Sequence, residues 1–319
     1  MSRGLRRCED HAVWDDFCRE SGEGSPFMES WFVEATSAAA DRYFWCEAGK
    51  PVAAILIPTR NGRSFRPKFS VHHSLCFSAE IGLLPPSEKI RAHYDLLGAI
   101  LPEIAALDDG LCLSFHPGIL DMRPLQWHNF DAPQKGHFRI NVRYTAIRSL
   151  LNFDTEADLL CDIRKDRRTD FRKSAPLTVS DQPDIDAFLS LYAMTFQRQN
   201  IEVGDDTLAM VRNILKSIPE KRGLVLTAID RESRPVSATA VLMGKRRAYS
   251  LLTANDPACR KLGANTRLVI EAMLRSRQAG MSDFDFVGAN SPNRADYKLS
   301  FNAELKPYFE AQFIQNTSE

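Results

Sequence analysis

The sequence has no long apolar run and no leader-like start. A membrane-spanning helix needs roughly eighteen or more consecutive apolar residues, and no such stretch occurs among the 319 residues. The first residues, "MSRGLRRCEDHAVW", become polar and acidic at once and contain no apolar signal core. These absences predict a cytoplasmic protein without a membrane span.

Cysteine pairs and a net charge are also missing. The seven cysteines are an odd number, lie scattered and form no CxxC pair. This argues against a disulfide framework or a zinc site and favours reduced, mostly buried thiols. The 41 basic and 41 acidic residues cancel, so no global field attracts phosphate-rich partners. Nucleic acid is therefore not the expected main ligand, and no metal is expected.

Histidine is absent from the second half of the chain. In the first half, His72 and His73 are adjacent in the strand-like stretch "SVHHSLCF". Adjacent residues of a strand point to opposite faces, so at most one of the two enters a given cleft, which argues against a metal site. We take His73 as a candidate for contact with an acceptor substrate.

One local pattern, in contrast, occurs twice. Residues 42–59 and 224–242 each contain a strand-like run, a polar turn, a basic residue before Pro-Val and a second strand rich in Ala and β-branched residues. Both predict β-hairpins with Pro51 or Pro235 at the head of the returning strand, where the missing N–H does least harm. Helices precede each hairpin, and strand, helix and strand follow it. The sequence therefore predicts an α/β chain of two tandem modules, residues 1–145 and 146–319.

The other expected elements follow from apolar periodicity. They are helices near 9–20, 26–38 and 87–106 with strands near 70–78 and 111–116, then helices near 183–200, 206–218 and 264–279 with strands near 247–254 and 283–288.

A single basic helix is predicted between the halves, over "DTEADLLCDIRKDRRTDFRKSAP". Thr155 is the expected N-cap, with Asp158 three residues later in a variant of the capping box. Arg164, Arg168 and Arg172 form a stripe on one side. This stripe is either an anion-binding ridge for a phosphate-bearing substrate or the solvated face of an amphipathic helix with ion pairs.

A glycine-containing loop opens the helix near 264–279. Such a junction offers unpaired N–H groups and the positive end of the helix dipole to a pyrophosphate. The alternative is an ordinary loop with an Asn or Thr N-cap. The candidate phosphate-binding residues are Arg260, Lys261, Gly263, Ala264, Asn265 and Thr266.

Several stretches together resemble the FemAB-like group of the GNAT acyltransferase superfamily, often labelled BioF2-like acetyltransferases. They are "IRKDRRTDFRKSAPLTV", "LYAMTFQRQN", "RPVSATAVLMGKRRAYSLLTAND" and "GANTRLVIEAMLRSRQAGMSDFDFVGANSPNRADYKLSFNAELKPYF". The last is the most specific, because an Asp-Phe strand is followed by an aromatic-Lys pair ahead of a Phe. The resemblance covers nearly the whole chain, more weakly in the first half.

The resemblance implies two GNAT-like modules, each a mixed, largely antiparallel sheet flanked by helices, with a cleft between them. It also implies transfer of an acyl or aminoacyl group to an amine, from acyl-CoA or aminoacyl-tRNA. Residues 183–220 contain no long helical arm of the kind often found in the tRNA-using members, which favours CoA. The superfamily's CoA loop, usually Arg/Gln-x-x-Gly-x-Gly/Ala, is matched here except for Asn265.

The resemblance also assigns site residues. Its functional aromatic-Lys pair falls on Tyr297 and Lys298, so we expect Lys298 to stabilise the oxyanion of a tetrahedral intermediate and Tyr297 to line the donor pocket or bind substrate. The alternative for Lys298 is a surface lysine whose stem covers apolar neighbours. Nothing in the sequence supplies a convincing general base. The further candidates for substrate binding are Asn290, Ser291 and Arg198, the Arg of the family's Tyr…Thr…Arg helix.

We therefore expect an N-acyltransferase that moves an acyl group from a CoA thioester to an amine of a small-molecule, saccharide or peptide acceptor in an envelope or polysaccharide pathway. One alternative is an aminoacyl-tRNA-dependent transferase, in which Arg164, Arg168 and Arg172 hold the acceptor stem. The other is a binding protein that has kept the fold without turnover.

Overall fold

The computed structural model describes residues 3–36, 39–197 and 201–315. The chain divides into two compact units, one formed by Met1–Arg143 with Pro307–Glu319 and the other by Tyr144–Lys306. The last strand, β13 (Glu304–Ile314), and the long strand β7 (His137–Ser149) each contribute residues to both units. The sequence-based division near residue 145 did not anticipate this return of the chain to the first unit.

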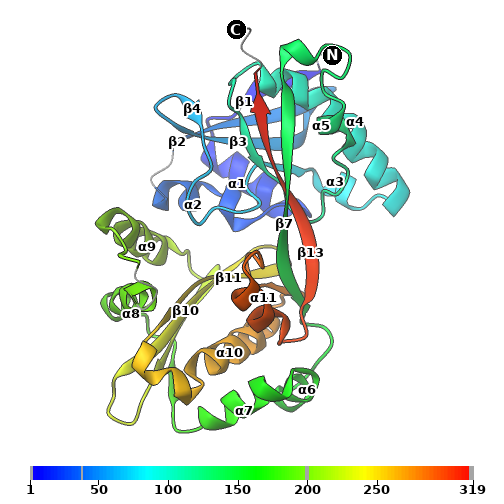
Figure 1. Ribbon diagram of the computed structural model, residues 1–319. Helices are drawn as coiled ribbons and strands as arrows, with labels where there is room; N and C mark the ends of the chain where they lie inside the picture. The colour runs from blue at the N-terminus through cyan, green and yellow to red at the C-terminus, as the bar shows by residue number, and fades with distance from the viewer. Residues whose placement is uncertain (1–2, 37–38, 198–200, 316–319) are drawn as a thin grey trace. The chain divides into compact units, whose positions relative to one another are not determined.

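The first unit is built around an antiparallel sheet in the order β1-β2-β3-β4, in which β5 also pairs with β3 (Figure 1). A second antiparallel pair joins β6 to β13, with Leu113 opposite Ala311. Its elements before β7 are β1 (Gly4–Arg7), α1 (His11–Glu20), η1 (Pro26–Met28), α2 (Ser30–Ala35), β2 (Ala39–Glu47), β3 (Lys50–Arg60), β4 (Arg63–Ser64), β5 (Leu75–Phe77), α3 (Ala79–Gly82), α4 (Pro86–Ala105), β6 (Cys112–Ser114), α5 (Arg123–Gln126) and η2 (Pro133–Lys135).

The second unit contains the strand order β7-β12-β11-β10-β9-β8. The helix α10 lies along β9 and β10, and its apolar face, including Leu268 and Met273, joins the strands in one buried core (Figure 1). Its elements after β7 are α6 (Glu156–Asp162), α7 (Lys165–Lys173), β8 (Thr178–Ser180), α8 (Ile185–Gln197), α9 (Asp205–Ser217), β9 (Gly223–Ile229), β10 (Pro235–Met243), β11 (Arg247–Asn255), η3 (Pro257–Leu262), α10 (Ala264–Gln278), β12 (Asp283–Asp285), α11 (Pro292–Leu299) and β13.

The two predicted hairpins are confirmed as β2–β3 and β9–β10. Pro51 is the second residue of β3 and Pro235 is the first of β10, so both lie at the head of the returning strand. The predicted mixed, largely antiparallel character is confirmed as well, since β11 and β12 form the one parallel pair among the described strand pairs. No helix in the described ranges is long and apolar enough to cross a membrane.

The basic helix predicted as one element is two. Its capping box at Thr155 and Asp158 is present as expected. The helix nevertheless ends at Asp162, because Ile163 is extended and buried in the core and the N–H of Arg164 donates to the Ser300 carbonyl at 3.0 Å. Tertiary contacts therefore override a continuous helical pattern at this point.

Candidate functional site

The loop before α10 reaches the helix through a left-handed glycine. Gly263 has φ 72° and is the N-cap, and within the described chain no side chain caps the helix. The alternative of an Asn or Thr N-cap is therefore not what the structure shows. Arg260 and Lys261 are exposed in the last turn of η3, directly ahead of the helix. An uncapped helix N-terminus beside two exposed cations is suited to an anion.

The side chains of Asn265 and Thr266 are directed to Tyr297 in α11. The amide Nδ2 of Asn265 donates to the Tyr297 hydroxyl at 2.9 Å, and the Thr266 hydroxyl lies 3.4 Å from the same oxygen. Burial raises the pKa of Tyr297 to about 12, so the phenol stays protonated at neutral pH. The Arg167 guanidinium lies over its ring at 4.8 Å. Tyr297 thus connects α11 to the beginning of α10.

Gly263 is also required by packing. A Cβ on this residue would lie 2.0 Å from the backbone carbonyl oxygen of Asp170 in α7. The glycine therefore permits α7 to approach the η3–α10 junction closely, and its presence is explained without a phosphate. The uncapped helix end and the exposed cations, rather than the glycine, support an anion site.

Lys298 is half-buried, and its ammonium is bound to backbone. Its Nζ donates to the carbonyl oxygens of Phe286 at 2.7 Å and Val287 at 3.1 Å, and also to that of Gly288. Burial lowers the pKa of Lys298 to about 8, and the nearby Asp285 carboxylate opposes this shift. Since an ammonium has three N–H groups, all of its donors are used in this conformation. The lysine is therefore not the exposed surface residue of the alternative interpretation.

Hydrogen bonds to Asp285 and Thr145 also hold the segment after β12 in place. The buried Asp285 accepts hydrogen bonds from the Thr145 hydroxyl at 2.5 Å and from the Val287 N–H at 2.8 Å. The Thr145 hydroxyl oxygen accepts in turn from the Gly288 N–H at 3.1 Å. Val287 has φ 52°, a strained value for a β-branched residue, and this dense bonding holds it there.

Asn290 and Ser291 follow this segment. The Asn290 side chain both accepts from the Tyr144 N–H at 2.8 Å and donates to the Tyr144 carbonyl at 3.0 Å. Ser291 is the exposed N-cap of α11 and makes no side-chain cap bond within the described chain. Asn290 therefore extends the pairing of β7 in this conformation, whereas the Ser291 hydroxyl is accessible to a ligand.

The predicted arginine ridge is largely engaged in intramolecular bonds. Arg164 donates to the Asp296 carboxylate at 2.6 Å, and Arg168 donates to the carbonyls of Cys161 and Ile163 at 3.1 and 3.0 Å. Arg168 thus stabilises the α6–α7 junction, and Arg164 connects the start of α7 to α11. The candidate Arg198 lies outside the described residues.

His73 belongs to the first unit and is fully buried. Burial lowers its pKa to about 3, so the ring is neutral at physiological pH. The structure therefore places His73 in the interior rather than on an accessible surface. Among the residues that the structure describes, no group of His, Cys, Asp or Glu is arranged to hold a metal ion.

The strand β12 pairs with β11 over all three of its residues, and β11 continues beyond that pairing. They pair only from Arg247–Asp283 to Tyr249–Asp285, although β11 continues to Asn255. Because β10 pairs with β11 along its other edge, the backbone of residues 250–254 has one edge that β12 does not cover in the described structure. An uncovered strand edge can pair with an extended ligand that contains amides.

Sequence reasoning did not identify the contributions of Thr145 and Arg167. Thr145 lies in β7, which the sequence analysis did not predict, and no local signal marked it. Arg167 is spaced four residues from both Ile163 and Phe171, and a charged residue at helical spacing from apolar residues indicates a specific partner.

Comparisons with known proteins agree with this geometry. Residues 162–299 match the family described as an acetyltransferase (GNAT) domain. No curated protein matches the sequence.

Among solved structures, FemX is 13% identical, with 97% of each chain covered and a TM-score of 0.67. L-PGS from Bacillus licheniformis is 14% identical, with 97% of this chain and 93% of that chain covered and a TM-score of 0.55. The tandem GNAT protein from the clavulanic acid biosynthesis pathway is 11% identical over 100% of both chains, with a TM-score of 0.54. At these identities the likeness to each structure shows the fold. The match over residues 162–299 places an acetyltransferase (GNAT) domain in the second unit, and together with the fold it supports the FemAB-like resemblance.

Proposed function

We propose that this acyltransferase takes its acyl group from a CoA thioester and transfers it to the amine of a small-molecule, saccharide or peptide acceptor. The observation that carries the proposal is the uncapped N-terminus of α10 behind the exposed Arg260 and Lys261. A pyrophosphate at this end would accept N–H donors from Ala264, Asn265 and Thr266 and be favoured by the helix dipole.

The uncovered edge of β11 supports the same donor. The pantetheine arm of CoA contains two amides, and an extended arm can pair with backbone groups of residues 250–254. The thioester would then approach the end of β12, where Lys298 and the fixed segment 286–290 lie. Amine attack on the thioester carbonyl forms a tetrahedral oxyanion, and thiolate departure completes the transfer.

In this proposal Lys298 is the positive charge nearest to the developing oxyanion, and Tyr297 lines the donor side. The three N–H groups of Lys298 donate to carbonyls. To donate a hydrogen bond to the oxyanion, Lys298 must therefore give up one of its bonds to a carbonyl. Its positive charge can stabilise the oxyanion without this rearrangement. Losing one such stabilising donor typically costs about 2.7–4 kcal/mol of activation free energy.

Thermal unfolding with CoA, acetyl-CoA and aminoacyl-tRNA tests the donor. A ligand at 100 times its dissociation constant stabilises the folded protein by about 2.7 kcal/mol. We expect both CoA compounds to raise the Tm and the double variant Arg260→Ala/Lys261→Ala to reduce the shift. The matched control is Lys216→Ala/Lys221→Ala, which removes two exposed cations that belong to no candidate site. If neither CoA compound changes the Tm of the unmodified protein, the proposed donor is wrong.

Aminoacyl-tRNA is the second candidate donor, and the similarity to FemX favours it, because tRNA-using transferases belong to the group that this chain resembles. The engagement of Arg164 and Arg168 with Asp296 and backbone carbonyls counts against it. A Tm shift with aminoacyl-tRNA alone, strongly reduced by added salt, would select this candidate.

A further inference from the structure

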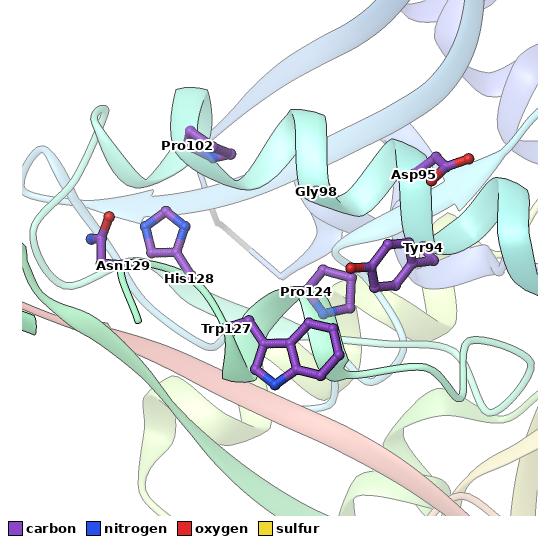
Figure 2. A pocket seen from close by; sticks show the side chains of 8 residues that line it. All are labelled: Tyr94, Asp95, Gly98, Pro102, Pro124, Trp127, His128 and Asn129. Carbon is purple, nitrogen blue, oxygen red and sulfur yellow. The ribbon is translucent and has the colours of Figure 1, made fainter. Parts of the chain in front are cut away.

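The first unit contains a groove that no residue of the candidate site lines. It encloses about 420 Å³, within the range of roughly 300–1,000 Å³ typical of small-ligand sites. Figure 2 shows α4 along one side and α5 with the segment after it along the other. The residues that line the groove include Tyr94, Gly98, Pro102, Pro124, Trp127 and Asn129.

Gly98 lines the groove and lowers the stability of the helix α4. It lies inside α4, where glycine destabilises a helix relative to alanine. A Cβ on Gly98 would meet no atom within 4 Å in the described part of the chain, so packing does not require glycine here. Close approach of a ligand to the helix backbone would explain it.

Pro102 provides the groove with a backbone acceptor. It also lies inside α4 and has no N–H, so the carbonyl of Gly98, four residues earlier, lacks its usual helical donor. Both residues line the groove. Two residues unfavourable to a helix therefore lie together on the groove, where the Gly98 carbonyl lacks the donor it would have in a regular helix.

Trp127 supplies a flat apolar wall. Its side chain is 52% exposed, yet its ring is held in place by Tyr94 at a centroid distance of 6.2 Å and by the Arg123 guanidinium at 5.8 Å. Figure 2 shows the indole and Pro124 lying next to each other below α4, with the Tyr94 hydroxyl directed toward Pro124. An exposed indole held in a groove is suited to stacking against an apolar ligand face.

The groove has neutral donors in the Tyr94 hydroxyl and in His128, whose pKa burial lowers, and its other polar side-chain and backbone groups include acceptors. The Asn129 amide nitrogen donates to the carbonyls of Lys135 and Gly136 at 3.3 and 3.0 Å, which leaves its Oδ1 as the group available to a ligand. With the Gly98 carbonyl and the Asp95 carboxylate, this set disfavours an anion. A cation is disfavoured too, because the Arg123 guanidinium already lies 4.9 Å from the Tyr94 ring centroid and over the Trp127 ring.

Since anions and cations are both disfavoured, the groove favours a neutral ligand that is rich in hydroxyl donors and has one apolar face. We propose that this groove binds a saccharide, with the C–H face of a sugar ring on Trp127 and its hydroxyl groups donating to the Gly98 carbonyl and Asn129 Oδ1. The site goes beyond the acyl-transfer reaction and does not depend on which donor that reaction uses.

Saturation-transfer NMR on the 319-residue chain tests the site, with cellotriose, chitotriose, maltotriose and mannotriose as separate probes and isothermal titration calorimetry giving the Kd. We expect at least one trisaccharide to bind. Trp127→Ala removes the stacking wall, and Gly98→Leu fills the groove with a residue that favours helix. Each should raise the Kd at least about tenfold, or 1.4 kcal/mol. Phe130→Ala, which removes an exposed aromatic ring outside the groove, should leave it unchanged.

A circular dichroism melt of Gly98→Leu controls for folding, and its Tm should equal or exceed that of the parent. The inference is wrong if none of the four trisaccharides binds, or if Gly98→Leu binds them as the parent does. Binding of a proline-rich peptide with no trisaccharide binding would also overturn it and would make the groove a peptide site.

Discussion

The backbone carbonyl oxygen of Asp170 lies where the side chain of residue 263 would begin, 2.0 Å from the ideal Cβ position of Gly263. This contact joins α7 to the start of α10 and therefore controls the geometry of the proposed phosphate site.

Gly263→Ala should destabilise the protein more than Gly280→Ala. Both glycines have positive φ, 72° and 88°, so both substitutions carry the left-handed penalty of roughly 1–2 kcal/mol. Only the Cβ at position 263 meets a backbone atom, whereas the one at 280 meets nothing within 4 Å in the described chain. The clash should add about 1–3 kcal/mol. Urea unfolding measures the difference, and equal losses for the two variants would contradict the contact.

Lys298→Met should lower both turnover and stability. Turnover should fall about 100- to 1,000-fold if the charge stabilises the oxyanion. The carbonyls of Phe286, Val287 and Gly288 also lose their donor, and each buried group left unpaired costs about 1–3 kcal/mol. Steady-state kinetics and chemical unfolding separate the two effects. Normal turnover in a folded Lys298→Met protein would refute the catalytic assignment.

The rate should decline as the pH rises through about 8, the lowered pKa of Lys298. The ammonium is the active form, so activity is present below this pKa and lost above it. Lys298→Arg keeps its charge in this range, so its residual rate should show no such decline. A pH–rate profile of kcat measures both. A parent rate that stays constant well above pH 8 would exclude a requirement for the ammonium.

The same pKa has a consequence for stability. The unfolded side chain titrates near its ordinary value of 10.5, so between about 8 and 10.5 the unfolded state binds more protons than the folded state. The contribution of Lys298 to the free energy of unfolding should therefore rise with pH across this window. Urea unfolding of the parent and Lys298→Met at several pH values isolates this contribution, and a difference that does not change with pH would argue against it.

Asn290→Ala should destabilise the protein, and Ser291→Ala should have little effect on stability. Asn290 makes two hydrogen bonds to the backbone of Tyr144, each with a net contribution of about 0.5–1.5 kcal/mol. The exposed Ser291 hydroxyl makes no cap bond in the described chain. Calorimetric melts compare the two. If Ser291→Ala raises the KM for the acceptor without lowering the Tm, Ser291 contacts the acceptor.

Local patterns predicted the elements that fold under local control. The hairpins at Pro51 and Pro235, the capping box at Thr155 and the amphipathic α10 were all predictable from turn residues and periodicity. The break at Ile163 was not, because it depends on a hydrogen bond between Arg164 and Ser300, which are far apart in the sequence.

The candidate site, too, could be predicted only in part from the sequence. The resemblance directed attention to Tyr297 and Lys298, but the sequence did not show where their polar ends are bound. The Tyr297 hydroxyl is held by Asn265 and the Lys298 ammonium by carbonyls at the end of β12, and both partners arise from tertiary packing. Likewise the strand-like pattern around His73 did not reveal that this side chain is fully buried.

The return of β13 to the first unit has a consequence for biosynthesis. β6 pairs with residues 310–312, and the first unit includes Pro307–Glu319. During translation the first unit therefore lacks one of its strands until residues 310–312 have left the ribosome. The unpaired edge of β6 is exposed throughout this interval. Nascent chains halted before residue 307 should accordingly recruit chaperones more strongly than chains that include all of β13.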